Sequence, residues 1–265
     1  MNVKKLFDLS DKTIILTGAA GFLGSSYVDG LSQAGANVVL CDVNLQGCKK
    51  IENNIKKKYD TNPISVKLDV TNTKSIENLI KKVTKKYSRI DVLINNAAYQ
   101  GDSKIRTVQF EELDINSWNK AIDVNLTGIF QLCQQVGKVM LKQKSGNVIN
   151  ISSIYGIVGA DQRIYGSSGL NSAVFYATTK SAILNLTRYL ASYWNRTGIR
   201  VNTLSPGGVQ NKQNKDFIKK YSEKTMIGRM AKNDEYVGAL VFLCSDASSY
   251  MTGSNLIIDG GWTAW

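Results

Sequence analysis

The fold is decided by Thr17-Gly-Ala-Ala-Gly-Phe-Leu-Gly24, a glycine-rich stretch between the short apolar run Thr13–Thr17 and the helical pattern Phe22–Ala34. Glycines lack a Cβ atom, so those at 18, 21 and 24 allow a tight turn and let a ligand approach the backbone. Free N–H groups at the start of a helix favour an anion such as a pyrophosphate. We therefore predict a dinucleotide-binding loop at the head of a βαβ unit. Its lining residues are Gly18, Gly21, Phe22, Leu23 and Gly24.

An acidic residue follows the second apolar run. Asp42 stands directly after Asn37–Cys41, where a carboxylate can accept hydrogen bonds from the ribose 2′-hydroxyl of an adenine dinucleotide and would repel a 2′-phosphate. The residue therefore favours NAD over NADP as the cofactor. The alternative interpretation is an aspartate in a surface turn that binds no ligand.

Strand-like and helix-like segments alternate along the whole chain. Seven short runs predict strands: Thr13–Thr17, Asn37–Cys41, Ile64–Leu68, Asp91–Ile94, Asn147–Ile151, Arg200–Leu204 and Asn255–Ile258. Helical periodicity covers Phe22–Ala34, Leu45–Tyr59, Lys74–Tyr87, Ser117–Leu141, Ala173–Trp194 and Asp234–Cys244. This alternation predicts a doubly wound (Rossmann) α/β fold, a seven-stranded parallel sheet with helices on both faces. We expect one domain over residues 1–265, with substrate loops at about 99–112, 155–175 and 207–230.

Composition excludes several classes of protein. The 265 residues are 43% hydrophobic and 20% charged, a globular balance unlike that of disordered, collagen-like or coiled-coil chains. The longest apolar run, Ala239–Cys244, is far shorter than the roughly 20 residues that cross a bilayer, and the first residues lack the apolar stretch of a signal peptide. We expect a cytoplasmic protein with no membrane partner. Because histidine is absent and the four cysteines form no C-x-x-C pair, we expect no metal site.

The net charge of +12 raises the question of an anionic partner. The lysines gather on separate predicted helices, as at Lys56–Lys58 and Lys85–Lys86, without the interleaved aromatic residues of a nucleic-acid platform. We interpret them as solvated helix faces and expect no nucleic-acid partner.

Tyr176 and Lys180 stand four residues apart in a helical segment, so both side chains lie on one face. An ammonium beside a phenol favours the phenolate and lowers its pKa. Tyr176 is therefore a candidate general acid/base in a chain without histidine. The same spacing also occurs by chance on many helix surfaces, so the pair indicates a catalytic role only together with further motifs.

Further motifs make the chain resemble the short-chain dehydrogenase/reductase family, in its compact single-domain branch, over nearly all its length. They are Asp69-Val70, Asn95-Asn96-Ala97-Ala98, Asn125 in Asp-Val-Asn-Leu-Thr-Gly, Ile151-Ser152-Ser153, Ser205-Pro206-Gly207-Gly208-Val209 and the closing Gly-Ser-Asn-Leu-Ile-Ile-Asp-Gly-Gly of residues 253–261. All occur in the family's order beside the glycine loop and the Tyr-Lys pair.

The resemblance implies a catalytic tetrad of Asn125, Ser153, Tyr176 and Lys180. It implies that Tyr176 exchanges a proton with the reacting oxygen, that Ser153 holds this oxygen, and that Lys180 binds the nicotinamide ribose. Asn125 would anchor a water next to Lys180; the alternative is an asparagine bonded to local backbone. Ser152 competes with Ser153 for its role. For the cofactor the resemblance implies contacts from Asp69, Val70, Asn95, Ala97, Pro206, Gly207 and Val209, besides Tyr176 and Lys180.

The chain also departs from the family pattern. Its glycine loop has the G-x-x-G-x-x-G spacing of the extended branch, with Phe22 in place of a glycine, and Asn211 stands where a threonine often bonds the nicotinamide amide. An insertion at 155–171 is rich in groups that bind polyhydroxylated ligands. With the closing aromatic residues it is similar to bacterial surface-sugar and flagellin-modification oxidoreductases. We expect Tyr155 and Arg163 to contact a carbohydrate-like substrate, although Arg163 in a solvated surface loop is the alternative.

Three further expectations concern the lid, the assembly and the reaction. Met226, Ile227 and Met230 either close over the ligand or pack into the core, and the aromatic C-terminus together with the resemblance indicates a homotetramer or homodimer. The leading hypothesis is an NAD(H)-dependent oxidoreductase that interconverts a secondary alcohol and a ketone on a sugar-like substrate. The alternatives are a redox-neutral nucleotide-sugar epimerase or dehydratase, and a non-catalytic NAD-binding regulator.

Overall fold

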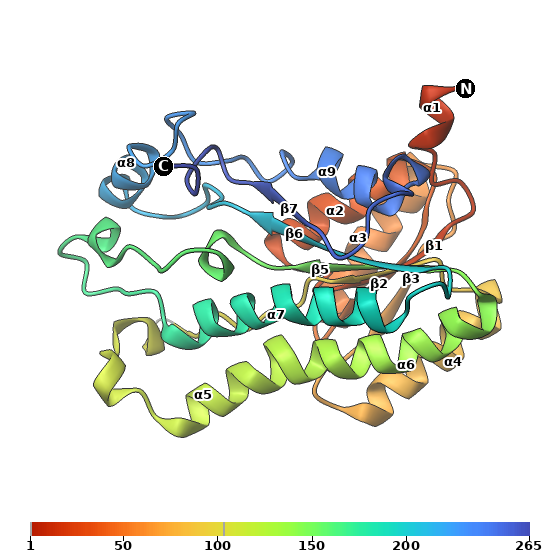
Figure 1. Cartoon of the computed structure of the whole chain (residues 1–265), viewed down its shortest axis with the longest axis horizontal. Helices are drawn as coiled ribbons and strands as arrows, with labels where there is room; N and C mark the ends of the chain where they lie inside the picture. The colour runs from red at the N-terminus through yellow and green to blue at the C-terminus, as the bar shows by residue number, and fades with distance from the viewer. Residues whose placement is uncertain (1, 103) are drawn as a thin grey trace.

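Seven parallel strands form one sheet through the middle of the molecule. The computed structural model describes residues 2–102 and 104–265. The strands are β1 (Thr13–Thr17), β2 (Asn37–Asp42), β3 (Ile64–Lys67), β4 (Val92–Asn95), β5 (Gly146–Ile151), β6 (Ile199–Pro206) and β7 (Asn255–Ile258). Their order is β3-β2-β1-β4-β5-β6-β7, with every neighbouring pair parallel. Strand β1 lies inside the sheet, with β2 and β3 on one side of it and β4 to β7 on the other, which confirms the predicted doubly wound sheet (Figure 1).

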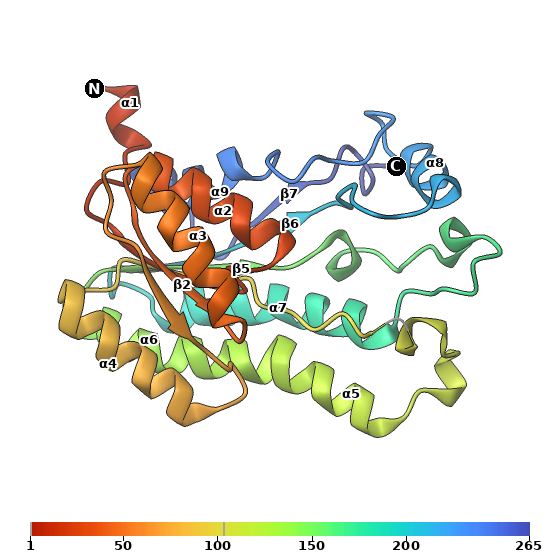
Figure 2. The ribbon, with the colours of Figure 1, turned by 180° about the vertical axis from the view of Figure 1, so that it is seen from behind.

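Helices cover both faces of the sheet, as predicted. They are α2 (Phe22–Gln33), α3 (Leu45–Lys58) and α9 (Val237–Cys244) on one face, and α4 (Thr73–Tyr87), α6 (Gly128–Gln143) and α7 (Val174–Tyr193) on the other (Figures 1 and 2). The strand β1 shows why two layers are needed: Ile14 and Leu16 point into one core and Ile15 into the other, and all three are fully buried. Alternate residues of a strand face opposite sides, so a strand that is apolar throughout requires cover on both.

The helix predicted over Ser117–Leu141 forms and contains a π-helical turn. It consists of α5 (Ile115–Ile122), the π-helical turn η3 (Asp123–Thr127) and α6. A π turn holds one residue more than an α-helical turn and is common at functional sites. Here it carries Asn125, which is fully buried and whose side-chain amide pairs with the backbone of Tyr99 in a distant loop. The helical periodicity did not predict the π turn, because the pairing that involves it is with a residue far away in the sequence.

Two helices, α1 (Val3–Leu6) and α8 (Lys215–Ser222), were not predicted. The helix α8 lies within the predicted loop 207–230 and packs on the insertion, which contains the short turn η5 (Gln162–Tyr165). These segments and the C-terminus share a small apolar cluster, which we name the lid cluster. Its buried members are Ile154, Ile164, Tyr165, Tyr221, Met230 and Trp262.

One of the three residues expected over the ligand or in the core belongs to the lid cluster. Met230 is buried within it, whereas Met226 and Ile227 are 53% and 64% exposed. Trp262 is also buried and stacks on Tyr221 with the ring centroids 4.3 Å apart, but Trp265 is 74% exposed. The association of copies through this end of the chain therefore stays a prediction that concerns Trp265 rather than Trp262.

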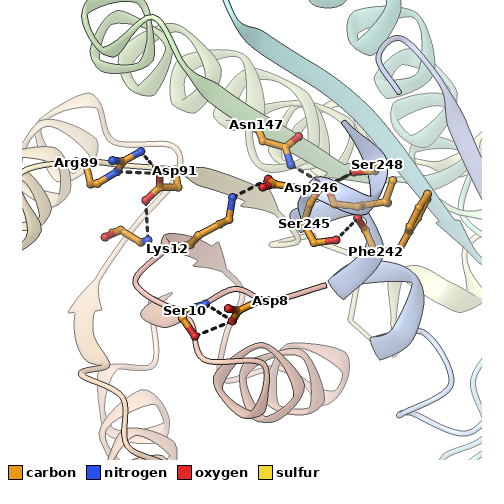
Figure 3. A network of polar contacts seen from close by, with 12 residues as sticks. Asp8, Ser10, Lys12, Arg89, Asp91, Asn147, Phe242, Ser245, Asp246 and Ser248 are labelled. Carbon is orange, nitrogen blue, oxygen red and sulfur yellow. Dashed lines mark hydrogen bonds and ion pairs between the residues drawn. The ribbon is translucent and has the colours of Figure 1, made fainter. Parts of the chain in front are cut away.

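Polar contacts connect the segments at the amino-terminal ends of the strands (Figure 3). The Nζ of Lys12 lies 3.0 Å from Asp246 Oδ1 in the turn η6 (Asp246–Ser248), and Asn147 Nδ2 of β5 donates to Leu243 O of α9 at 2.8 Å. Asp91 pairs with Arg89 and accepts from the backbone N–H of β1. Exposed ion pairs of this kind contribute under about 1 kcal/mol each. They lie at the end of the sheet opposite to the cavity described below. Within the described residues, no helix combines the length and apolarity that a membrane span requires.

Candidate active site

A cavity of about 670 Å³ lies at the carboxyl ends of the central strands, where ligands of doubly wound sheets bind. Most of the cofactor residues predicted from sequence line it. These are Gly18, Gly21, Phe22, Leu23, Gly24, Asp42, Asp69, Val70, Ala97, Pro206, Gly207 and Val209. Ser153, Tyr155 and Tyr176 line it too. The fold therefore brings the predicted dinucleotide loop and the predicted reacting groups to one cavity.

The glycine loop leaves room for a ligand at the start of α2. Gly18 has a φ of +66°, a conformation that favours glycine, and a Cβ on Gly24 would lie 2.0 Å from the Gly18 carbonyl oxygen. Gly21 precedes the first turn of α2 and provides no side chain to cap its N–H groups. Free N–H groups at the start of a twelve-residue helix bind an anion well. The loop therefore fits the pyrophosphate of a dinucleotide.

The carboxylate of Asp42 is held in place beside the glycine loop. Its Oδ2 accepts from the backbone N–H of Ala20 at 3.1 Å, and its Oδ1 accepts from Asn44 N–H at 2.9 Å. Two backbone donors thus keep the negative charge on the wall that follows β2. This position fits the adenosine ribose of a dinucleotide.

The structure places Asn95 away from the cavity. Its side chain is fully buried and donates from Nδ2 to Asn150 Oδ1 at 2.8 Å, so it joins β4 to β5. The next residue, Asn96, lines the cavity instead and donates to Thr17 O at 3.0 Å and to Gly18 O at 3.2 Å. Neighbouring residues of a strand face opposite sides, which explains why the two asparagines separate. Asn96 thus supports the glycine loop.

The geometry separates the two candidate serines. Ser153 lines the cavity together with Tyr176, and its Oγ accepts from Tyr155 N–H at 3.2 Å. Ser152 is buried, and its Oγ donates to the backbone carbonyl of Lys180 at 2.7 Å. Ser152 therefore fastens β5 to α7, and Ser153 is the serine that can meet a ligand together with Tyr176.

Lys180 does not lower the pKa of Tyr176 as the sequence led us to expect. Its Nζ donates to Ile151 O at 2.7 Å and lies over the Tyr176 ring, 5.7 Å from the centroid. Burial lowers the pKa of Lys180 to about 8. Burial also raises the pKa of Tyr176, although the neighbouring Ser153 acts in the other direction. The expected lowering of the Tyr176 pKa is therefore not found in the protein itself, because removal of the phenol from water outweighs the neighbouring groups.

Asn125 acts as a clamp between distant segments. Its Oδ1 accepts from Tyr99 N–H at 2.6 Å, and its Nδ2 donates to Tyr99 O at 2.9 Å and to Thr179 Oγ1 at 3.2 Å. The predicted alternative, a bond to local backbone, is wrong because its partner lies 26 residues away. Asn125 thereby fixes the loop after β4 beside the helix that carries Tyr176.

The remaining wall of the cavity comes from the three predicted substrate loops. Beyond Tyr99, Tyr155 and Tyr176 it includes Gln100, Arg106, Tyr165, Asn171, Asn211, Gln213, Phe217 and Tyr221. Arg163 is not among the lining residues: its side chain is 83% exposed, and its guanidinium binds Asp161 through two bonds of 2.9 Å. Sequence reasoning named Arg163 and missed Arg106, although Arg106 lies inside the predicted loop 99–112.

Comparisons with known proteins agree with this geometry. The sequence profile of the family described as enoyl-(acyl carrier protein) reductase matches residues 18–263. Over 260 residues the chain is 34% identical to the 3-oxoacyl-[acyl-carrier-protein] reductase FabG of Thermotoga maritima, covering 96% of this chain and 98% of that protein. It is 30% identical to the post-translational flagellin modification protein A of Campylobacter coli, with 96% and 99% covered. It is 31% identical to the D-threitol dehydrogenase of Mycolicibacterium smegmatis, with 97% and 95% covered.

A solved structure extends the comparison to three dimensions. The gluconate 5-dehydrogenase from Burkholderia cenocepacia, crystallised with NADP and tartrate, superposes with a TM-score of 0.89 at 26% identity over the whole of both chains. The chain belongs to the short-chain dehydrogenase/reductase family and is an oxidoreductase of the CH–OH group.

Proposed function

We propose that this enzyme uses NAD(H) to interconvert a secondary alcohol and a ketone on a small, polyhydroxylated substrate. The observation that carries the proposal is that Ser153 and Tyr176 line the same cavity as the glycine loop and Asp42. Asp42 supports NAD as the cofactor, because its carboxylate would repel the 2′-phosphate of NADP. The amide and tyrosine side chains of the remaining wall support a hydroxylated substrate, because they both donate and accept hydrogen bonds.

The roles of the residues follow from their protonation. The pKa of Tyr176 is raised, so at neutral pH its phenol holds a proton that it can give to a carbonyl oxygen. Ser153 donates a second hydrogen bond to that oxygen and orients it. Lys180, with a pKa of about 8, is mostly charged at neutral pH and stabilises the phenolate that Tyr176 leaves behind. A nicotinamide bound beside Tyr176 supplies the hydride chemistry.

The direction of the reaction affects its pH dependence. Reduction consumes the proton of the Tyr176 phenol, whereas oxidation requires the phenolate to accept a proton from the alcohol. Because the pKa of Tyr176 is raised, we expect the rate of oxidation to increase with pH over the range in which the protein is folded.

The first test measures turnover from the absorbance of reduced nicotinamide, with NAD or NADP and a panel of alditols, sugar acids, sugar phosphates and nucleotide sugars. We expect turnover with NAD, and a loss of about 10²- to 10⁴-fold in Tyr176→Phe. Tyr189→Phe is the matched control: it removes a phenol from an exposed position of the same helix, and we expect a change within about twofold. Full activity of Tyr176→Phe would contradict the proposal. NAD that remains bound without net turnover would indicate the redox-neutral epimerase instead.

A further inference from the structure

The charges on the cavity wall are divided between its two ends. Its acidic residues are Asp42, the last residue of β2, and Asp69, just after β3, at the end assigned to the adenosine. Among the described residues that line the cavity, Arg106 is the single cationic side chain, and the loops around it contribute no acidic side chain to the wall. The end of the cavity that receives the substrate therefore carries a net positive charge.

Arg106 belongs to the substrate end by its position in the fold. It lies in the turn η1 (Ile105–Thr107), where its backbone carbonyl accepts from Asn171 N–H of the insertion at 2.7 Å. Its neighbour Ile105 packs in the apolar cluster of Phe175 and Tyr176. The glycine loop at the start of α2, by contrast, already offers backbone donors to the cofactor's pyrophosphate. Arg106 is therefore placed for the molecule that reacts with Tyr176.

The guanidinium of Arg106 differs from other arginines of the protein. Arg163 binds Asp161 through two bonds, and Arg229 binds Glu235 in the same way. Within residues 2–102 and 104–265, neither an ion pair nor a side-chain hydrogen bond involves Arg106, although the residue is half-buried. A partly desolvated cation without an anionic partner is unfavourable, and a ligand that provides the anion offsets this cost.

From these observations we infer that the substrate carries a carboxylate in addition to its reacting carbinol, and that Arg106 binds this carboxylate. The inference rests on the proposed function. The planar guanidinium matches two carboxylate oxygens with two parallel hydrogen bonds. A single cation balances a monoanion, whereas a phosphate dianion would leave one negative charge without a partner on this wall. The amides of Gln100, Asn171 and Gln213 then serve the hydroxyls, which defines the substrate class as polyhydroxylated carboxylic acids.

The test compares matched substrates of four to six carbons: alditols, the corresponding aldonic acids and the corresponding sugar phosphates. With wild-type enzyme and NAD we expect the highest kcat/KM for an aldonic acid. Arg106→Gln should lower kcat/KM for the acid about 10- to 100-fold, mainly through KM, and change the value for the alditol by no more than about twofold. Arg106→Lys keeps the positive charge but not the planar guanidinium. Its kcat/KM for the acid should therefore lie between those of the wild type and Arg106→Gln.

Two further variants make the result specific to this position. Arg188→Gln removes an exposed arginine of α7 that does not line the cavity, and it should leave the preference for acids unchanged. Arg163→Gln tests the rival cation, and loss of the preference in this variant would overturn the assignment to Arg106. Calorimetric titration of the aldonate into NAD-loaded Tyr176→Phe, with and without Arg106→Gln, measures how much Arg106 contributes to binding in the absence of turnover.

The remaining outcomes separate this inference from the proposed function. Turnover of alditols in preference to acids, or an equal loss for both in Arg106→Gln, would overturn the carboxylate and leave the oxidoreductase in place. A preference for sugar phosphates would replace the monoanion with a dianion and also overturn the inference. If none of the three classes reacts with NAD, the proposed function itself fails.

Discussion

The buried ammonium of Lys180 should make the free energy of unfolding depend on pH. Burial lowers its pKa from 10.5 to about 8. Below pH 8 the lysine is protonated in both the folded and the unfolded chain, so the penalty for burying the charge is constant. Between about pH 8 and 10.5 the unfolded chain holds a proton that the folded chain has lost, and stability therefore rises with pH over this range.

The size of this effect follows from the shift. Each pH unit within the range contributes about 1.4 kcal/mol, so the wild type should gain about 2 kcal/mol over the first 1.5 units or so above pH 8. Lys180→Met keeps the length of the side chain and cannot titrate. The difference in free energy of unfolding between wild type and Lys180→Met should therefore move by about 2 kcal/mol in favour of the wild type over that interval.

Urea denaturation without added cofactor, at a series of pH values from neutral to mildly alkaline, measures this difference. Lys142→Met, which removes an exposed lysine of α6, serves as the control and should give a difference that does not vary with pH. A difference between wild type and Lys180→Met that stays flat, or that moves in favour of the variant, would refute the reasoning. It would mean that the ammonium is solvated or paired in the folded protein.

Three further variants and one control test the cofactor site and the lid cluster. Asp42→Ala should reduce the preference for NAD over NADP by about tenfold or more, and an unchanged ratio of kcat/KM values would contradict the ribose contact. Gly24→Ala would place a Cβ 2.0 Å from a backbone oxygen and should cost about 1–3 kcal/mol of stability, whereas Gly159→Ala, with nothing within 4 Å, should have little effect on the melting temperature. Trp262→Ala should lower the free energy of unfolding in urea by about 3 kcal/mol, and a loss below about 1 kcal/mol would argue against its burial in the lid cluster.

Local sequence patterns predicted the strands of the sheet well, because a strand buried on both faces needs a run of apolar residues. The bounds of β1 and β7 match the predicted runs, and the other strands differ by one or two residues at one or both ends. Runs that are apolar throughout suit strands buried on both faces, so their pattern depends little on the rest of the fold. The helix α8 was missed because its apolar residues pack on the insertion, a partner that the local sequence does not reveal.

The candidate site was predicted less evenly. The glycine loop, Asp42, Ser153 and Tyr176 reach one cavity because each is tied to the carboxyl end of a strand or to a helix with a clear pattern. Arginines in loops have no such constraint: the direction of Arg163 is set by Asp161, and that of the loop with Arg106 by Asn171. The pKa of Tyr176 was misjudged because burial, the largest influence on it, is a property of the folded chain.

The π turn Asp123–Thr127 has a consequence for how this helix tolerates change in its gene. Since a π turn contains one additional residue, deletion of a single codon would allow the helix to continue from α5 into α6 as a regular α-helix. The reading frame and the helix would both survive. The residues on either side would keep their relative orientation, because the π turn takes up its additional residue within one turn, but the residues inside the turn would be displaced along the helix. Asn125 could then no longer face Tyr99, so this deletion would leave the helix intact and release the loop beside Tyr176.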